Sequence, residues 1–355
     1  MFEAKIRELQ QRMPEEMDGL FITGDVNRTY LSGLRTSAGT LLITRKSAYF
    51  FADFRYIELV RERVPHMLAV QPGATLGITI EDILDVEGVT RIGFEDRVVT
   101  VAELARMEEK YPACRFCPMG GLVDDLRRVK ESEELLRMIA AQRMADHAYV
   151  NLLNFIKAGR TELEVRDELE RLMRKEGSEE PAFPTIVISG RKTSMPHGVP
   201  SDKVIEEGDF VTMDFGATSE YYKSDMTRTV AVGHATEEME RVYQTVYDAQ
   251  QLALSHIRAG VRGDEVDAVA RDFINAAGYK GCFGHGLGHS VGLEIHEAPS
   301  FSPSCHDVIE GGTVITVEPG IYLEGKFGVR IEDIVSVNAQ GVENYTASPK
   351  HLMIL

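Results

Sequence analysis

Two segments of the chain each place a pair of acidic residues at hairpin spacing. The first, VTMDFGATSEYYKSDMTRTVA (211–231), has two β-rich arms around a polar turn, and a turn centred between Ser219 and Glu220 makes Asp214 and Asp225 cross-strand partners. Directly opposed residues have β-carbons about 4.5–5.5 Å apart. Two bare carboxylates at that distance repel each other, so one binds a proton or both share cations. Taken alone, the segment is more typical of a solvated hairpin with two surface aspartates.

The second segment, TVEPGIYLEGKFGVRIEDIV (316–335), repeats this pattern. A turn centred on Gly325 makes Glu318 and Glu332 opposed, and Arg330 shares the face of Glu332 because side chains alternate along a strand. Two hairpins that each direct an acidic pair toward one side are hard to explain as surface decoration. In a protein interior, such pairs are tolerated when metal ions neutralise them.

Together, the four carboxylates could hold two divalent cations about 3.5–4 Å apart, as in two-metal hydrolases. A nitrogen ligand would complete the set, and the segment GCFGHGLGHSVGLEIHEAP (281–299) offers His285, His289 and His296. The glycines between these histidines argue against a helical HxxxH zinc site. A ligand set of mostly oxygen with one imidazole suits Mn²⁺ or Co²⁺, with Zn²⁺ and Fe²⁺ as alternatives.

The helices that must position these hairpins recur in the sequence. IKAGRTELEVRDELERLMRKEG (156–177) and IRAGVRGDEVDAVARDFINAAG (257–278) align without a gap, and each follows a long helical pattern and precedes a β-rich stretch. We expect the first long helix to run from Glu131 to about Ala158, and Thr161 to begin the next helix with a capping box. Each copy is followed by one acidic hairpin, which predicts an internal duplication with pseudo-twofold symmetry.

The first part of the chain is an α/β unit. Strands are predicted at 20–23, 40–44, 48–52 and 91–95, and helices at 2–13, 54–63 and 100–111. The paired glycines and charge-dense run of MGGLVDDLRRVKESEE (119–134) mark a boundary, so we expect domains at 1–125 and 126–355. No acidic pair or histidine cluster is found in the sequence of the first domain, so the sequence predicts no catalytic role for it.

Composition restricts the class of partner and the compartment. The 355 residues are 43% hydrophobic and carry a net charge of −17, which argues against nucleic acid and anionic membrane surfaces as partners. No apolar run approaches the roughly 20 residues that span a bilayer, and the N-terminal segment MFEAKIRELQQRM is typical of a charged amphipathic helix. We expect a cytoplasmic protein. Cys114 and Cys117 form a lone CxxC without a second pair, which favours idle thiols over a zinc site.

Five motifs carry a resemblance to a known superfamily: MPHGVPSD (195–202), MDFGATSEYYKSDMTRT (213–229), GHGLGHSVGLEIHEAP (284–299), EPGIY (318–322) and VRIED (329–333). They resemble the metallopeptidases of the methionine aminopeptidase, prolidase and aminopeptidase P superfamily, designated M24. The likeness covers about 130–350, and the preceding α/β region resembles the N-terminal domain of prolidase and creatinase. The resemblance implies an α+β catalytic domain of the pita-bread (creatinase/aminopeptidase) fold.

The resemblance also implies roles for individual residues. The metal ligands would be Asp214, Asp225, His289, Glu318 and Glu332. Asp225 and Glu332 would bridge two ions, with Mn²⁺ favoured, and His289 would bind one ion and Glu318 the other. The residues on the substrate side would be His197, His285, His296 and Arg330. A hydroxide bridging the two cations would attack the scissile carbonyl, because bound metal lowers the pKa of water. Glu318 would transfer the proton, and His197 and His296 would stabilise the charged intermediate. Thr227, on the face of Asp225, would support the ligands.

The implied function is hydrolysis of Xaa-Pro bonds at peptide N-termini, by an aminopeptidase or a dipeptidase. Alternatives are a non-prolyl metalloaminopeptidase, a creatinase-like C–N hydrolase and an inactive binding homologue. Prolidases of this type often carry an arginine four residues after the equivalent of His296, whereas Ser300 stands there in this chain. This difference weakens a strict dipeptidase assignment. The resemblance further implies a homodimer.

Overall fold

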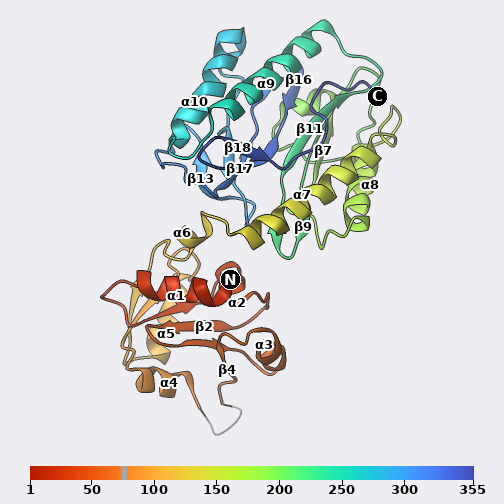
Figure 1. Cartoon of the computed structure of the whole chain (residues 1–355). Coiled ribbons are helices and arrows are strands. Elements are labelled where there is room, and N and C mark those ends of the chain that lie inside the picture. Colours follow the sequence, from red (N-terminus) through yellow and green to blue (C-terminus); the bar gives the residue numbers. More distant parts are fainter. Residues whose placement is uncertain (74–77) are drawn as a thin grey trace. The chain divides into compact units, whose positions relative to one another are not determined.

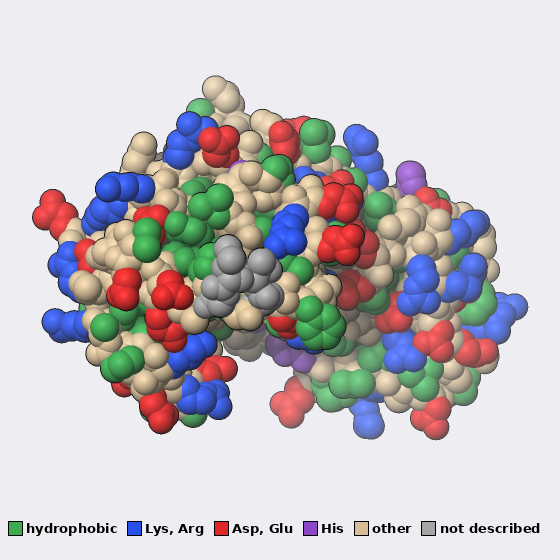
Figure 2. Space-filling view, turned by 90° about the horizontal axis from the view of Figure 1, so that it is seen from below, with side chains coloured by type: hydrophobic (Ala, Val, Ile, Leu, Met, Phe, Trp, Pro, Cys, Tyr) green, Lys and Arg blue, Asp and Glu red, His purple; other side chains and the backbone are tan. Residues whose placement is uncertain are grey.

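The computed structural model describes residues 1–73 and 78–355, and the chain divides into two compact units, Met1–Arg127 and Arg128–Leu355 (Figure 1). None of the described helices combines the length and apolar character that a membrane crossing requires. On the face shown in Figure 2, acidic and basic side chains are interspersed.

The first unit contains a six-stranded mixed sheet in the order β4-β3-β2-β1-β5-β6. Its strands are β1 (Gly19–Ile22), β2 (Thr40–Thr44), β3 (Ala48–Phe51), β4 (Leu68–Val70), β5 (Arg91–Phe94) and β6 (Arg115–Pro118). Its helices are α1 (Phe2–Arg12), α2 (Asp25–Ser32), α3 (Ile57–Arg63), α4 (Ile80–Glu87), α5 (Val101–Lys110) and α6 (Asp124–Arg127). The four strands and three helices predicted here are present, whereas α2, α4, α6, β4 and β6 were not predicted because they are short.

The second unit contains two pairs of helices, and each pair is followed in sequence by a group of strands. Its helices are α7 (Ser132–Leu152), α8 (Glu162–Lys175), α9 (Glu237–His256) and α10 (Gly263–Ile274), with a short 3₁₀ helix, η1 (Gly190–Ser194), and a short π-helix, η2 (Asn275–Tyr279). The predicted capping box is confirmed, since the Thr161 side chain accepts from the amide of Glu164. The prediction that the first long helix reaches Ala158 was wrong. The chain leaves the helix after Leu152, and Gly159 N instead donates to Ile205 O at 2.9 Å.

The strands of this unit form two main sheets and two short ribbons. The three-stranded sheet has the order β11-β8-β7, with β7 (Ile186–Ser189), β8 (Phe210–Phe215) and β11 (Met226–Ala231). The five-stranded sheet has the order β13-β12-β14-β17-β18, with β12 (Gly288–Ser290), β13 (Glu297–Phe301), β14 (Val314–Val317), β17 (Asp333–Val337) and β18 (Val342–Asn344). The ribbons are β9 (Thr218–Ser219) with β10 (Tyr222–Lys223), and β15 (Gly320–Leu323) with β16 (Phe327–Arg330).

Each helix pair packs on its own sheet, which gives the unit two similar halves. Apolar residues of α7 and α8, such as Tyr149 and Leu169, pack with Met213 of β8. Residues of α9 and α10, such as Val246, pack with Ile315 of β14. The order of two helices followed by an antiparallel sheet thus occurs twice, as the sequence repeat predicted. Acidic hairpins therefore emerge at matching places in the two halves.

Candidate metal centre

The first acidic hairpin is present, but its register differs from the prediction. Asp214 lies in β8 and pairs with Thr227 of β11, not with Asp225. The turn is centred between Glu220 and Tyr221, and both residues have positive φ (45° and 73°). The predicted turn was one residue too early, and a one-residue shift of the centre moves the cross-strand partner by two residues. Because side chains alternate with a period of two, Asp225 still shares the face of Thr227.

The second acidic hairpin has the register predicted from its sequence. Gly320 pairs with Arg330 across the β15–β16 ribbon, and Val317 pairs with Asp333 where β14 meets β17. The two strand pairs have the same register. Glu318 and Glu332, which lie between the paired segments, therefore stand opposite each other. Glu332 N donates to Thr227 O at 3.1 Å, which joins this hairpin to β11 of the other half.

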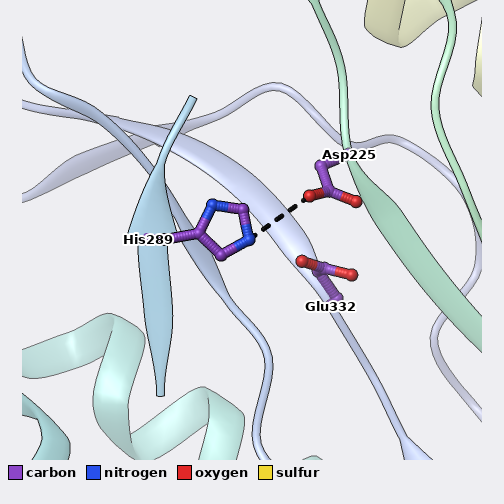
Figure 3. A group of neighbouring side chains, drawn as sticks. All are labelled: Asp225, His289 and Glu332. Carbon is purple, nitrogen blue, oxygen red and sulfur yellow. Dashed lines mark ion pairs between the residues drawn. The ribbon is translucent and has the colours of Figure 1, made fainter. Parts of the chain in front are cut away.

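The nitrogen donor comes from a third strand. His289 lies in β12, and its Nε2 is 3.5 Å from Asp225 Oδ2 and 3.6 Å from Glu318 Oε1. Asp225, His289 and Glu332 each present one ligand atom, all within 4.8 Å of one another, and Figure 3 shows the three side chains pointing toward a common centre. The neighbouring Gly288 allows this approach, since a β-carbon there would stand 2.0 Å from Thr316 O.

Burial and mutual repulsion oppose charge on this cluster. Burial, together with repulsion from neighbouring carboxylates, raises the pKa of Asp225 and of Glu332 well above the ordinary range. Burial likewise raises the pKa of Glu318 to about 8, and it lowers the pKa of His289 to about 4. Burial therefore favours the protonated form of these carboxyls and the neutral form of the imidazole, which is the form that binds metal.

The donor set fits divalent cations. Asp214 Oδ1 is buried and has no hydrogen-bond partner among the described residues, although its Oδ2 is paired with Arg330 at 2.6 Å. A buried carboxylate oxygen without a partner is costly unless a bound group satisfies it. Cations would satisfy this oxygen and also neutralise the surrounding carboxylates.

A chain of hydrogen bonds that starts at Arg330 supports two of the predicted metal ligands, Asp214 and Glu332. Arg330 donates from Nη2 to Asp214, from Nε to Thr227 Oγ1 at 3.0 Å, and from Nη1 to Tyr322 Oη at 2.9 Å. Thr227 Oγ1 in turn donates to Glu332 Oε2 at 2.7 Å. These bonds fix the positions of two carboxylates, one from each half. The supporting role predicted for Thr227 agrees with this geometry.

The sequence analysis missed Tyr322, which connects this chain to His285. Tyr322 Oη lies 2.8 Å from His285 Nε2, and His285 Nδ1 lies 2.8 Å from Gly286 O. The arrangement is consistent when Nδ1 carries the proton and Nε2 accepts from the tyrosine. Period-two alternation from Glu318 to Tyr322 was the available signal, because it places both residues on one face.

The predicted site residues line one cavity of about 550 Å³. His197 and His296 are exposed on its walls, and the His296 ring centroid is 4.2 Å from that of His289. His285, all five predicted ligands and Arg330 line the same cavity. Apolar side chains that the sequence analysis did not single out form much of the remaining wall: Phe183, Pro184, Ile186, Pro196, Val199, Pro200 and Ile295.

The family model of metallopeptidase family M24 matches residues 137–339. The chain belongs to metallopeptidase family M24. The creatinase/prolidase N-terminal domain matches residues 5–129. The larger unit of this M24 peptidase has the pita-bread fold, as the resemblance implied.

Relatives match this M24 chain over nearly its whole length. A peptidase of Bacillus subtilis is 42% identical over 339 residues, 96% of each chain. The structure of an Xaa-Pro dipeptidase from Bacillus anthracis has 41% identity and a TM-score of 0.96, and the match covers 100% of both chains. That of an X-Pro aminopeptidase from Thermotoga maritima has 35% identity and a TM-score of 0.91, and covers 96% of this chain and 98% of that one.

Proposed function

We propose that the protein is a metal-dependent peptidase that hydrolyses Xaa-Pro bonds at peptide N-termini. The observation that carries the proposal is the convergence of four carboxylates and His289 on one cavity with an apolar wall. The names of the relatives from Bacillus anthracis and Thermotoga maritima, an Xaa-Pro dipeptidase and an X-Pro aminopeptidase, support the same substrate class.

Two divalent cations would be held by Asp214, Asp225, His289, Glu318 and Glu332. Asp225 and Glu332 would contact both ions, as the resemblance implied. The 3.6 Å separation of His289 Nε2 and Glu318 Oε1 suits two ligands of the same ion, so we assign them to one ion in place of the two inferred from sequence. We propose Mn²⁺ because oxygen donors predominate.

Bound cations would supply a water-derived nucleophile at neutral pH and polarise the scissile carbonyl. Glu318, which lines the cavity, would accept a proton from the attacking water and return it to the leaving nitrogen. His296 and His197, exposed in the cavity, would donate hydrogen bonds to the oxygen on which negative charge develops.

Two of the residues predicted to be catalytic would act through their neighbours. His285 has both ring nitrogens engaged, by Gly286 O and Tyr322 Oη, so we assign it the orientation of Tyr322 and, through it, of Arg330. Arg330 donates to Asp214, Thr227 and Tyr322, and also to Pro196 O at 3.4 Å, so it would position ligands and not bind the substrate.

Substrate selection tests this proposal most directly. With Mn²⁺, we expect Ala-Pro-Ala to be cleaved to alanine and Pro-Ala, and Ala-Ala-Ala to be cleaved at least about tenfold more slowly, since the apolar wall favours the proline ring. Chelation should abolish both reactions. Preferred cleavage of Ala-Ala-Ala or Met-Ala-Ala would favour the non-prolyl aminopeptidase, and no bound or activating divalent ion would favour the metal-free hydrolase or the inactive homologue.

His296→Ala should lower kcat by about 10²–10³-fold, because one pre-organised donor to the developing charge is lost. His234→Ala is the matched control, since His234 is exposed and lies outside the described cavities. Steady-state kinetics on Ala-Pro-Ala compares the two variants. Equal activity of both would remove His296 from the proposed machinery.

The homodimer and the cytoplasmic location stay predictions. Sedimentation showing a monomer at micromolar concentration would contradict the dimer. The four cysteines are free thiols in the structure, which is consistent with a reducing compartment. Cell fractionation would test the location.

A further inference from the structure

A second cavity adjoins the catalytic one. Its volume is about 370 Å³, and it shares Ser300 and Ser302 with the cavity of about 550 Å³ that contains the acidic cluster. Beyond these two serines it is lined by residues of β13, such as Pro299, and by residues of the loop that follows β13, such as Ser304. Because both cavities are lined by the same two side chains, we treat them as one groove that extends from the catalytic cavity past Ser300 and Ser302.

The groove carries a row of three hydroxyl groups. Ser300 Oγ is 3.2 Å from Ser302 Oγ, which is 3.4 Å from Ser304 Oγ. Within the described ranges, these hydroxyls make hydrogen bonds only to one another. Each hydroxyl can donate once and accept twice. The row therefore has unused donors and acceptors that match the N–H and C=O groups of a peptide backbone.

The described residues that line the catalytic cavity include no lysine and no unpaired arginine. The one arginine among them, Arg330, is committed to Asp214 at 2.6 Å. A carboxylate directly after the proline would lose hydration there without gaining a charged partner, which is unfavourable. A peptide group at the same place could instead exchange hydrogen bonds with the serines.

The ionic side chains along the groove are already paired. Glu297 contacts Lys130 at 3.0 Å, and Asp307 contacts Arg128 at 2.5 Å. The groove is therefore polar but has no strong charge preference of its own. It suits a peptide backbone of varied sequence better than one charged ligand.

We propose that this groove binds the residues that follow proline in the substrate, so that the enzyme selects Xaa-Pro peptides of three or more residues over Xaa-Pro dipeptides. The inference rests on the proposed function for the reaction. It adds a preference for substrate length and names the residues that would bind the longer peptides: Ser300, Ser302 and Ser304.

A length series tests the proposal. With Mn²⁺, kcat/KM should rise at least about tenfold from Ala-Pro to Ala-Pro-Ala and again by about 2- to 10-fold to Ala-Pro-Ala-Ala, as expected for one or more added hydrogen bonds. Ser304→Trp fills the outer groove and should lower the ratio of tetrapeptide to tripeptide kcat/KM toward one. Ser255→Trp, at an exposed position on α9 outside the described cavities, should leave that ratio unchanged. Equal or falling kcat/KM with length, or equal ratios in both tryptophan variants, would overturn the proposal.

A binding measurement separates this proposal from the proposed reaction. Calorimetry on the metal-free protein should show Pro-Ala-Ala binding more tightly than proline, and Ser302→Ala should reduce that difference by about 2- to 10-fold. If no Xaa-Pro peptide of any length is cleaved in the presence of metal, the proposed function fails, whereas this binding difference still decides for or against the groove. Equal affinity for Pro-Ala-Ala and proline would contradict the proposed binding of peptide in the groove.

Discussion

At the scale of single residues, Thr227 connects the two halves of the site. Its hydroxyl donates to Glu332 and accepts from Arg330, which also holds Asp214. One small side chain thereby orients two carboxylates that come from hairpins about a hundred residues apart. Supporting contacts of this kind usually affect metal affinity by about 10–100-fold.

Thr227→Val should therefore weaken Mn²⁺ binding by about 10–100-fold, because valine has nearly the same shape but lacks the hydroxyl. Thr227→Ser keeps the hydroxyl and should retain most of the affinity. Isothermal titration calorimetry on chelator-treated protein measures both. Unchanged affinity in the valine variant, with circular dichroism showing the native fold, would contradict the role assigned to this hydroxyl.

At the scale of secondary-structure elements, close backbone packing positions His289. Strand β12 lies against β14, and the space beside Gly288 is filled by Thr316 O, 2.0 Å from the place of a β-carbon. The strands can approach only because this residue has no side chain. The position of the imidazole thus depends on its neighbour in the strand.

Gly288→Ala should destabilise the protein by about 1–3 kcal/mol or more, because the obstructing atom is backbone and cannot rotate away. Gly284→Ala is the matched control, since no described atom lies within 4 Å of the place that its β-carbon would take. Urea unfolding followed by circular dichroism gives both free energies of unfolding. Equal stability of the two variants would show that β12 and β14 separate easily.

At the scale of the whole catalytic unit, a buried ion pair ties the halves together behind the metal centre. Arg228, on β11, donates to Asp333 Oδ1 at 2.9 Å, and also to Ser348 O and Pro349 O. Arg228 is 1% exposed, so its charge is tolerated only because these acceptors surround it. The pair lies beside Thr227 and Glu332 in sequence and fixes how the two sheets meet.

Arg228→Met should cost about 3–5 kcal/mol of stability, because the buried acceptors lose a charged partner. Arg241→Met changes an exposed arginine on α9 and should stay within about 0.5 kcal/mol of the wild type. Thermal and chemical unfolding compare the two. A small effect for Arg228 would mean that Lys350, 2.6 Å from Asp333, compensates alone.

The acidic cluster should make the metal-free protein less stable as pH rises. The Glu318 carboxyl has a pKa of about 8 in the folded protein, against 4.5 in the unfolded chain, because burial disfavours its charge. The folded state therefore keeps a proton that the unfolded state releases between these values. This contribution to stability is complete below pH 4.5 and is lost as pH rises toward 8.

Unfolding midpoints of chelated protein at about pH 5.5, 7 and 8.5 measure this effect. Added Mn²⁺ should raise stability most at the highest pH, because cations then replace protons as the neutralising charge. Glu318→Gln should flatten the pH dependence of the metal-free protein. A metal-free protein whose stability does not fall across this range relative to the metal-saturated form would contradict this account.

The sequence by itself determined the repeated helix pairs and the second hairpin. Apolar periodicity and the capping residue Thr161 encode α8 locally, and the turn at Gly325 sets the register of Glu318 and Glu332. The five predicted ligands also lie together, since each is positioned by an element that its own local sequence specifies.

The tertiary structure alone decided the partner of Asp214, the hydrogen bonds of Tyr322 and the groove past Ser302. The first register follows from a turn in which two non-glycine residues adopt positive φ, which sequence patterns rarely indicate. Tyr322 acquires its partners from segments distant in the chain, and the groove exists only where two cavities meet at the serines. Local sequence determines which face of a strand a side chain occupies, but only packing between the two halves determines what that side chain meets.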